Sequence, residues 1–327
     1  MTQGGSEIKE SELPEEALID TAFLHLTRAC DLRCDYCYFS AAEPEPGELT
    51  LAEWGSVFQE LSAIAPQKVV LTGGEPLLKQ GIWELLELPE LAELRTKTRV
   101  CLNTNGRLVG GQAARRLVQA VDEVRLSLDG ARPDHDAQRG EGSYDAAMQA
   151  AAHLREYGME PKLLITVTSK TLAGLPSFVA NLLQSGFRKL SVHPVKLIGR
   201  AKGTPEIAVS YPEVQKALAQ AWRQVTGAKV DSDWFPGTQN HCGVGRYLNL
   251  SPTGIVTPCH VLDHPRWHCG NVRETSLRKL LRPGQMLRQL ANLDFQKQAD
   301  RDPNWRPLLT AGTCFGDSPA KDSWFVV

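Results

Sequence analysis

Short apolar runs rich in β-branched residues alternate with helical stretches between about residue 20 and residue 200. This alternation is typical of repeated strand–helix units around a parallel sheet. Six right-handed units close about three-quarters of an eight-stranded TIM-type barrel and leave one side open. The sequence therefore predicts an α/β fold, a partial (β/α)6 barrel. The expected strands are Ala22–Leu26, Lys68–Leu71, Arg99–Leu102, Val124–Leu128, Leu163–Thr168 and Lys189–Val192.

Helix signals stand between these strands. Thr50 followed by Glu53 is a capping box that predicts a helix over Leu51–Ile64. An Ala-rich helix is expected from Ser143 to Tyr157. The segment from Trp83 to Leu94 predicts one or two surface helices broken near Pro89, because proline cannot continue a helix.

The pattern changes after Gly203, where a smaller α+β domain is expected. We divide the chain into a polar N-terminal arm (residues 1–20), the barrel (21–205) and this C-terminal domain (206–327). Its expected elements are a helix over Pro212–Val225, a hairpin around Tyr247–Val256 turned by Pro252, Thr253 and Gly254, and short helices near Ser276–Leu281 and Gly284–Leu293.

Charge and composition argue against several classes of function. The chain carries 36 basic and 38 acidic side chains, which are interspersed, so no basic face predicts nucleic-acid binding. No apolar run approaches the length of about 20 residues that crosses a bilayer. The acid-rich start, residues 1–20, is unlike a secretory signal. We therefore expect a cytoplasmic protein without nucleic-acid or membrane partners, whose eight cysteines serve metal or redox chemistry rather than disulfides.

Three cysteines, Cys30, Cys34 and Cys37, follow the first predicted strand with the spacing C-x-x-x-C-x-x-C. Three thiolates this close can hold three irons of a 4Fe–4S cluster and leave the fourth iron open to an external ligand. A structural zinc site would need a fourth protein ligand. His25 is the only local candidate, and it lies within the strand. The spacing therefore favours a cluster.

Polar and glycine motifs follow the next predicted strands. Gly73-Gly74-Glu75-Pro76 comes after the second strand, Asn103-Thr104-Asn105-Gly106 after the third and Ser127-Leu128-Asp129-Gly130 after the fourth. Asn-Gly and Asp-Gly are also general turn signals. Because the carboxyl ends of barrel strands meet on one face, we expect these motifs to gather beside the cysteines.

Together the cysteine and strand-end motifs resemble the radical S-adenosylmethionine (SAM) superfamily. The resemblance implies that the methionine moiety of SAM chelates the open iron of a 4Fe–4S cluster held by Cys30, Cys34 and Cys37. It further implies that Tyr36 lies beside the adenine and that Arg139 pairs with the methionine carboxylate. The remaining residues implied to bind SAM are Gly73, Gly74, Glu75, Pro76, Asn103, Ser127 and Asp129. A final segment, from His193-Pro194 through Gly199-Arg200-Ala201, is similar to the one that closes over the adenine by apolar and backbone contacts.

The chemistry that the resemblance implies is the reductive cleavage of SAM. An external one-electron reductant, such as flavodoxin or ferredoxin, supplies the electron. The 5'-deoxyadenosyl radical that forms then abstracts a hydrogen atom from the substrate.

A second cysteine set, Cys242, Gly254 and Cys259, has the spacing C-x11-G-x4-C. This resembles radical SAM subfamilies with a SPASM or shortened twitch domain, although the dense group of four further cysteines is absent. We expect one auxiliary 4Fe–4S cluster on Cys242, Cys259 and Cys314. The fourth ligand could be Cys269 or a histidine such as His241, His260 or His268, or the fourth iron could stay open and bind substrate. The alternative is a zinc-stabilised or cluster-free domain. Cys101, within the third strand, is expected to be an inert core residue.

Two enzyme functions and one non-enzymatic function are open at this point. The resemblance favours a maturase of a ribosomally synthesised peptide that forms a crosslink or inverts a stereocentre. Cys269 would then be a catalytic thiol that returns a hydrogen atom, and leader-peptide binding would call for a separate protein. The alternative is a dehydrogenase or epimerase of a small molecule, such as a sugar, a cyclitol or a cofactor precursor. An iron–sulfur scaffold without turnover would require the strand-end motifs to be accidental.

Overall fold

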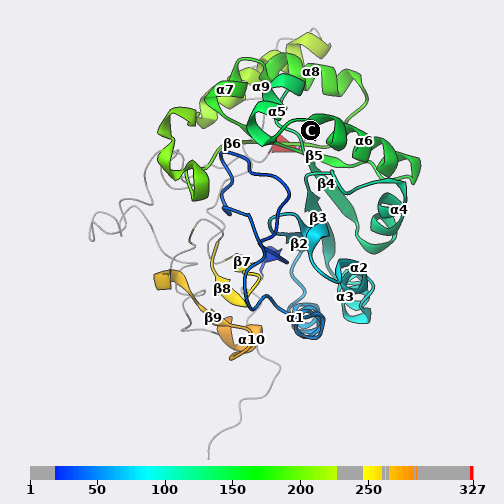
Figure 1. Cartoon of the computed structure of the whole chain (residues 1–327), viewed down its shortest axis with the longest axis vertical. Coiled ribbons are helices and arrows are strands. Elements are labelled where there is room, and N and C mark those ends of the chain that lie inside the picture. Colours follow the sequence, from blue (N-terminus) through cyan, green and yellow to red (C-terminus); the bar gives the residue numbers. More distant parts are fainter. Residues whose placement is uncertain are drawn as a thin grey trace, which may run out of the picture.

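The computed structural model describes residues 19–226, 246–259, 262, 265–282, 285 and 325–326. In this part of the chain, one sheet has the order β10-β6-β5-β4-β3-β2-β1-β7-β8-β9, with β1 to β6 parallel (Figure 1). The six parallel strands are β1 Thr21–His25, β2 Lys68–Thr72, β3 Arg99–Thr104, β4 Glu123–Ser127, β5 Lys162–Val167 and β6 Leu190–Pro194. All six predicted strands are therefore confirmed.

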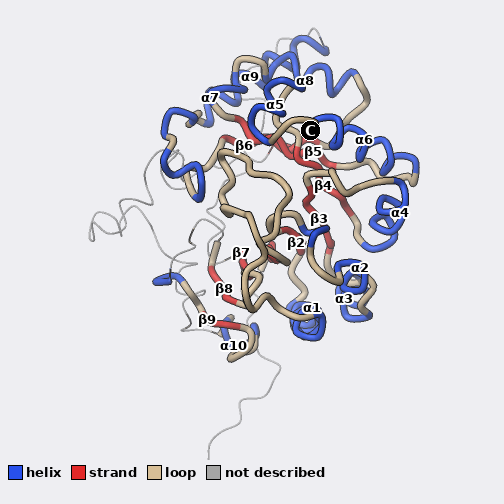
Figure 2. The backbone as a smooth tube through the Cα atoms, viewed as in Figure 1, coloured by secondary structure: helices blue, strands red, loops and turns tan. Residues whose placement is uncertain are grey.

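The two faces of this sheet differ in chemistry. On the outer face the register aligns Leu24, Leu71, Leu102 and Val124, all fully buried. Figure 2 shows helices along the outside of the strands, and the outer side chains belong to the main hydrophobic core. Because side chains alternate along a strand, the other residues face the barrel interior. These inner residues include Thr72, Asn103, Ser127, Thr166 and His193.

The helices of the barrel follow their strands as expected. The capping box at Thr50 and Glu53 is present at the start of α1. The segment around Pro89 forms two helices, since the proline begins the second one. The α-helices are α1 Leu51–Ile64, α2 Ile82–Leu86, α3 Pro89–Arg95, α4 Gly111–Ala120, α5 Arg132–Arg139, α6 Ser143–Glu156, α7 Ser169–Leu172, α8 Leu175–Gln184, α9 Tyr211–Thr226 and α10 Leu277–Leu280; the 3-10 helices are η2 Pro76–Leu78, η3 Gly199–Gly203, η4 Pro205–Ile207 and η6 Pro265–Trp267. None of the described helices is long and apolar enough to cross a membrane.

The predicted C-terminal hairpin is present and joins the barrel sheet. Strand β7 (Tyr247–Leu250) lies parallel to β1, and β8 (Ile255–Thr257) and β9 (Gly270–Asn271) continue the sheet in antiparallel fashion. A left-handed Gly254 turns the hairpin, with φ of 90°. Strand β10 (Phe325–Val326) pairs with β6 at the other edge. These contacts tie the segment after residue 205 to the barrel, and the domain boundary at that residue stays a prediction; the expected helix at Gly284–Leu293 lies outside the described residues.

Candidate active site

The cysteine loop, residues 26–42, connects β1 to the segment before α1. A backbone bridge closes its neck, with Cys30 N donating to Ala42 O at 2.9 Å and Ala42 N donating to Arg28 O at 3.1 Å. Inside the loop, Cys37 N donates to Cys34 O at 3.2 Å. Figure 1 shows this blue segment crossing the end of the barrel. The short turns keep three thiols within one small loop.

The three thiols share one electrostatic neighbourhood. Burial, together with the nearby charges of Glu75 and Cys34, raises the pKa of Cys30 to about 11. Burial likewise raises the pKa of Cys34, which Arg139 lowers and Cys37 raises. Among the described residues, no three His, Cys, Asp or Glu side chains converge tightly enough for a single metal ion. A 4Fe–4S cluster takes one thiolate on each iron, so three thiols spaced around one loop fit a cluster better than a single ion. Cluster binding would release the protons of these thiols.

The glycine pair of the Gly73-Gly74-Glu75-Pro76 motif holds the cysteine loop by its backbone. Gly74 N donates to Thr27 O at 2.9 Å and Glu75 N donates to Ala29 O at 2.7 Å. A Cβ on Gly74 would lie 2.2 Å from Ala29 O, and one on Gly73 would lie 2.5 Å from Thr27 O. The close approach that requires glycine here is therefore to the loop, and the expected contact with SAM stays a prediction.

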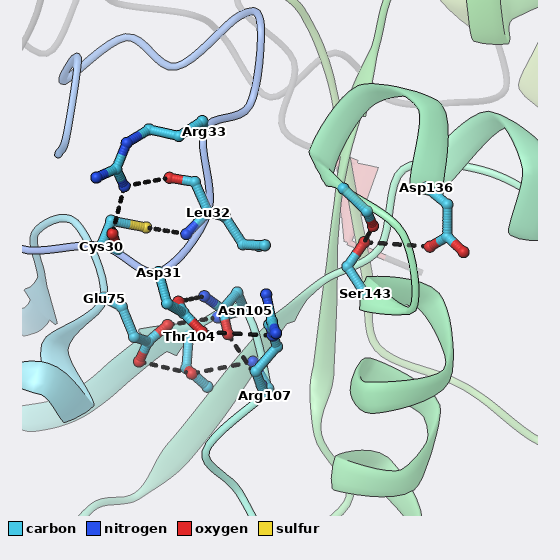
Figure 3. A network of polar contacts seen from close by, with 12 residues as sticks. Cys30, Asp31, Leu32, Arg33, Glu75, Thr104, Asn105, Arg107, Asp136 and Ser143 are labelled. Atoms are coloured by element: carbon cyan, nitrogen blue, oxygen red, sulfur yellow. Dashed lines mark hydrogen bonds and ion pairs between the residues drawn. The ribbon is translucent and has the colours of Figure 1, made fainter.

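Glu75 is fully buried and links the second and third strand ends. Its carboxylate accepts hydrogen bonds from Leu77 N at 3.1 Å, Thr104 Oγ1 at 2.8 Å and Asn105 N at 2.8 Å. Burial raises the pKa of Glu75 to about 7, although these hydrogen bonds lower it. Asn105 Nδ2 in turn donates to Asp31 at 2.8 Å, next to Cys30 (Figure 3). The network fixes the start of the loop to β3.

Asp129 and Arg139 form a buried ion pair beneath Tyr36. Arg139 Nε and Nη2 donate to Asp129 Oδ2 and Oδ1 at 2.6 and 3.1 Å. The Tyr36 hydroxyl also donates to Asp129, and the Arg139 guanidinium lies 5.4 Å from the centre of the Tyr36 ring. Burial raises the pKa of Asp129, but the charge of Arg139 dominates the opposing effects and holds it below its usual value. Three predicted SAM residues are thus brought together, and two donors of Arg139 are already engaged.

The segment after β6 also holds the cysteine loop, through hydrogen bonds from Arg200 to loop carbonyls. Arg200 Nε donates to Cys34 O at 2.8 Å, Arg200 Nη1 to Ala41 O at 2.8 Å and Arg200 N to Cys37 O at 3.0 Å. A Cβ on Gly199 would lie 2.2 Å from Tyr38 O. From the sequence, this segment was expected only to close over the adenine. Its role in holding the loop has no local signal, because the contacts span about 160 residues.

Asn103 and Ser127 face the barrel interior, as their place at strand ends predicts. Asn103 Nδ2 lies 3.5 Å from Thr72 Oγ1, whereas Asn103 Oδ1 is buried without a hydrogen-bond partner among the described residues. A buried acceptor of this kind calls for a donor from a ligand or water. Separately from these two residues, an open pocket of about 330 Å³ lies between the cysteine loop and α5, with Asp31, Arg107 and Arg139 among its lining. The residues present fit a polar cofactor beside a cluster.

The second cysteine set is described only in part. Cys259 is buried after β8, and Cys269 N donates to Val256 O at 2.8 Å on the neighbouring strand. Burial raises the pKa of Cys269 to about 12, so this thiol holds its proton. Cys242 and Cys314 lie outside the described residues, as do His241 and His260. The auxiliary ligand set therefore stays a prediction.

Comparisons with known proteins decide the family. The model of the radical SAM superfamily matches residues 24–176. Mycofactocin maturase MftC of Mycobacterium ulcerans is 30% identical over 262 residues, which cover 76% of this chain and 70% of the relative. The chain belongs to the radical SAM superfamily. Members of this superfamily use a 4Fe–4S cluster and SAM, and the chain is a radical SAM enzyme.

Other relatives differ in their named activities. An AdoMet-dependent heme synthase of Nitratidesulfovibrio vulgaris is 26% identical over 298 residues, covering 81% of this chain and 79% of the relative. Among solved structures, anSMEcpe with bound AdoMet has a TM-score of 0.68 at 21% identity, covering 82% of this chain and 81% of that one. Streptococcus suis SuiB bound to its precursor peptide SuiA has a TM-score of 0.69 at 14% identity, covering 85% and 67%. These two structures share the radical SAM fold.

Proposed function

We propose that this radical SAM enzyme is a cytoplasmic maturase that abstracts a hydrogen atom from a ribosomally synthesised peptide. The observation that carries the proposal is the 30% identity to mycofactocin maturase MftC, which extends over 70% of that protein. The SuiB fold, solved with a precursor peptide, adds support at the level of architecture. The product would be a crosslink or an inverted stereocentre.

The cofactor roles follow from the residues around the cysteine loop. We assign three irons of the cluster to Cys30, Cys34 and Cys37, and an auxiliary cluster to Cys242, Cys259 and Cys314. When bound, the cluster and SAM supply the 5'-deoxyadenosyl radical that removes a substrate hydrogen atom. The part left to this chain's own residues is to bind and orient the cofactors and the substrate. Asn103 Oδ1 offers an unused acceptor, and the remaining donors of Arg139 suit a carboxylate.

The position of the loop depends on hydrogen bonds from two side chains outside the loop. Arg200 binds two carbonyls of the loop with its side chain, and Glu75 binds the ends of η2 and β3. Such contacts would hold the loop and its thiols in position for a cluster. An external reductant such as flavodoxin or ferredoxin would supply the electron, and a separate protein would bind a leader peptide.

Anaerobic reconstitution tests the cofactor assignment. The chain should bind about eight irons if it holds two 4Fe–4S clusters and about four if it holds one. With dithionite and SAM it should release 5'-deoxyadenosine, and the variant with Cys30, Cys34 and Cys37 all changed to Ala should not. Continued release by that variant would contradict the assignment.

A second candidate function is a reaction on a small cofactor precursor. It is favoured by the heme synthase relative, which aligns over 79% of its own length. One assay distinguishes the two functions: the rate of 5'-deoxyadenosine release with a candidate substrate is compared with the rate without substrate. A synthetic peptide encoded by a short reading frame beside the gene should raise that rate, and a porphyrin precursor of heme should not. The opposite result would favour the small-molecule function.

A further inference from the structure

A cluster of charged side chains lines the inner face of the barrel at the end opposite to the cysteine loop. It comprises Lys68 on β2, Arg99 on β3, Glu123 and Arg125 on β4, and Lys162 on β5, which we call the basic floor. The strand register makes Lys68 a neighbour of Arg99 and Arg125 a neighbour of Lys162. Four cations thus surround one carboxylate.

That carboxylate is already engaged by two of the four cations. Arg99 Nη2 lies 2.6 Å from Glu123 Oε2, and Arg125 Nε lies 2.6 Å from Glu123 Oε1, while the Glu123 side chain is only 5% exposed. Neither Lys68 nor Lys162 forms an ion pair with another described residue. The floor therefore carries an excess of positive charge that no described carboxylate balances.

Burial and the neighbouring charges both act on Lys162. Burial lowers the pKa of Lys162 to about 8; Glu123 opposes that shift, whereas Arg125, Lys68 and Arg99 add to it. Burial also lowers the pKa of Lys68. An anion placed between these groups would relieve the repulsion among them, because opposite charges in a partly buried site favour the charged forms.

Arg125 offers hydrogen-bond donors to such an anion. Its side chain is 11% exposed, and its Nη2 donates to the Cys101 sulfur at 3.2 Å. A neutral thiol is a weak acceptor. Cys101, expected to be an inert core residue, is indeed fully buried, but it lies on this polar face rather than in the main core. The planar guanidinium matches a carboxylate better than it matches sulfur.

We propose that the basic floor binds a carboxylate group of the substrate. The proposal deepens the proposed function, on which its peptide form rests. Arg125 lies two residues before Ser127 and four before Asp129, so the floor is about 7 to 13 Å below the strand ends, at about 3.3 Å per residue. The partly buried Leu164 and Thr166 on β5 line the inner face between these levels.

This separation fixes where a bound substrate reacts. An extended peptide advances about 3.3 to 3.6 Å per residue. A carboxylate on the floor therefore places the reactive carbon two to four residues away along a peptide, or a corresponding distance away on a small acid. The floor would act as an anchor, and the chemistry would occur at the other end.

Binding of simple carboxylates to the full 327-residue chain tests the proposal without cofactors or turnover. The probes are succinate with its neutral analogue succinamide, and N-acetyl-Gly-Gly-Gly with its C-terminal amide, measured by calorimetry. A third peptide, N-acetyl-Gly-Glu-Gly-amide, distinguishes a side-chain carboxylate from a C-terminal one. The acids should bind and their amides should not. Changing Lys68→Gln or Lys162→Gln should weaken acid binding about tenfold or more, the loss typical of one hydrogen bond to a charged group.

Two further variants keep the test decisive. Arg125→Lys retains the positive charge and should bind succinate more weakly than the wild type, because it cannot form a paired hydrogen bond. Lys216→Gln changes an exposed lysine on α9 and should have no effect. Equal binding of acids and amides, or unchanged binding by both Lys68→Gln and Lys162→Gln, would overturn the proposal. Succinate binding without peptide turnover would leave the floor in place and remove only the peptide function.

Discussion

The buried pair of Asp129 and Arg139 allows a quantitative test of how this site is held. The carboxylate of Asp129 is fully buried and accepts two hydrogen bonds from Arg139, one from Thr166 N at 2.9 Å and one from Tyr36. Changing Asp129→Asn keeps the shape but leaves the Arg139 charge without its counter-ion. Removing one partner of a buried ion pair costs about 3 to 5 kcal/mol. We expect a loss of that size in the free energy of unfolding.

The assay is urea unfolding of the cofactor-free protein near neutral pH, followed by circular dichroism. Adding Arg139→Met to Asp129→Asn should recover at least about 1 kcal/mol, because neither charge is then left unpaired. The matched control is Asp145→Asn, which breaks an exposed pair with Arg132 and should cost at most about 1 kcal/mol. A loss below 1 kcal/mol for Asp129→Asn, or no recovery in the double variant, would refute the reasoning.

Three further changes address the same region. The pKa of Glu75 is raised to about 7, so Glu75 contributes stability below pH 4.5 that is lost as the pH rises through 7; Glu75→Gln should remove that slope from urea-unfolding curves, and an unchanged slope would contradict it. Gly74→Ala places a Cβ 2.2 Å from Ala29 O and should reduce the iron bound on reconstitution, whereas Gly110→Ala, with nothing within 4 Å, should not. If the enzyme is an epimerase, Cys269→Ala should keep hydrogen abstraction, measured as 5'-deoxyadenosine, but lose the inverted product.

Much of the fold could be predicted because its signals are local. The apolar runs became β1 to β6, and Thr50 with Glu53 caps α1, since strand periodicity and capping involve residues close in sequence. The spacing of Cys30, Cys34 and Cys37 also lies within one loop. For the same reason, the hairpin turn at Gly254 was predictable from three residues.

The partners of the site residues could not be predicted in this way. Gly73 and Gly74 were expected to approach a ligand, which stays a prediction; the structure adds their close approach to the backbone of Thr27 and Ala29, which the sequence did not indicate. Arg139 was expected to bind a methionine carboxylate, and two of its donors bind Asp129. Each side chain offers the same chemistry to a ligand and to a neighbouring strand, so the residue type alone does not distinguish the two.

The sequence by itself determined that this chain forms a parallel strand–helix barrel with a three-thiol loop at its mouth, and it pointed to the radical SAM family. Only the tertiary structure decided which strand faces point inward, that Arg200 holds the loop from about 160 residues away, and that the far end of the barrel carries unbalanced positive charge. These features depend on strand register and on contacts between distant segments. Local sequence patterns indicate neither the register nor these contacts, because both depend on strands and segments that are distant in the sequence.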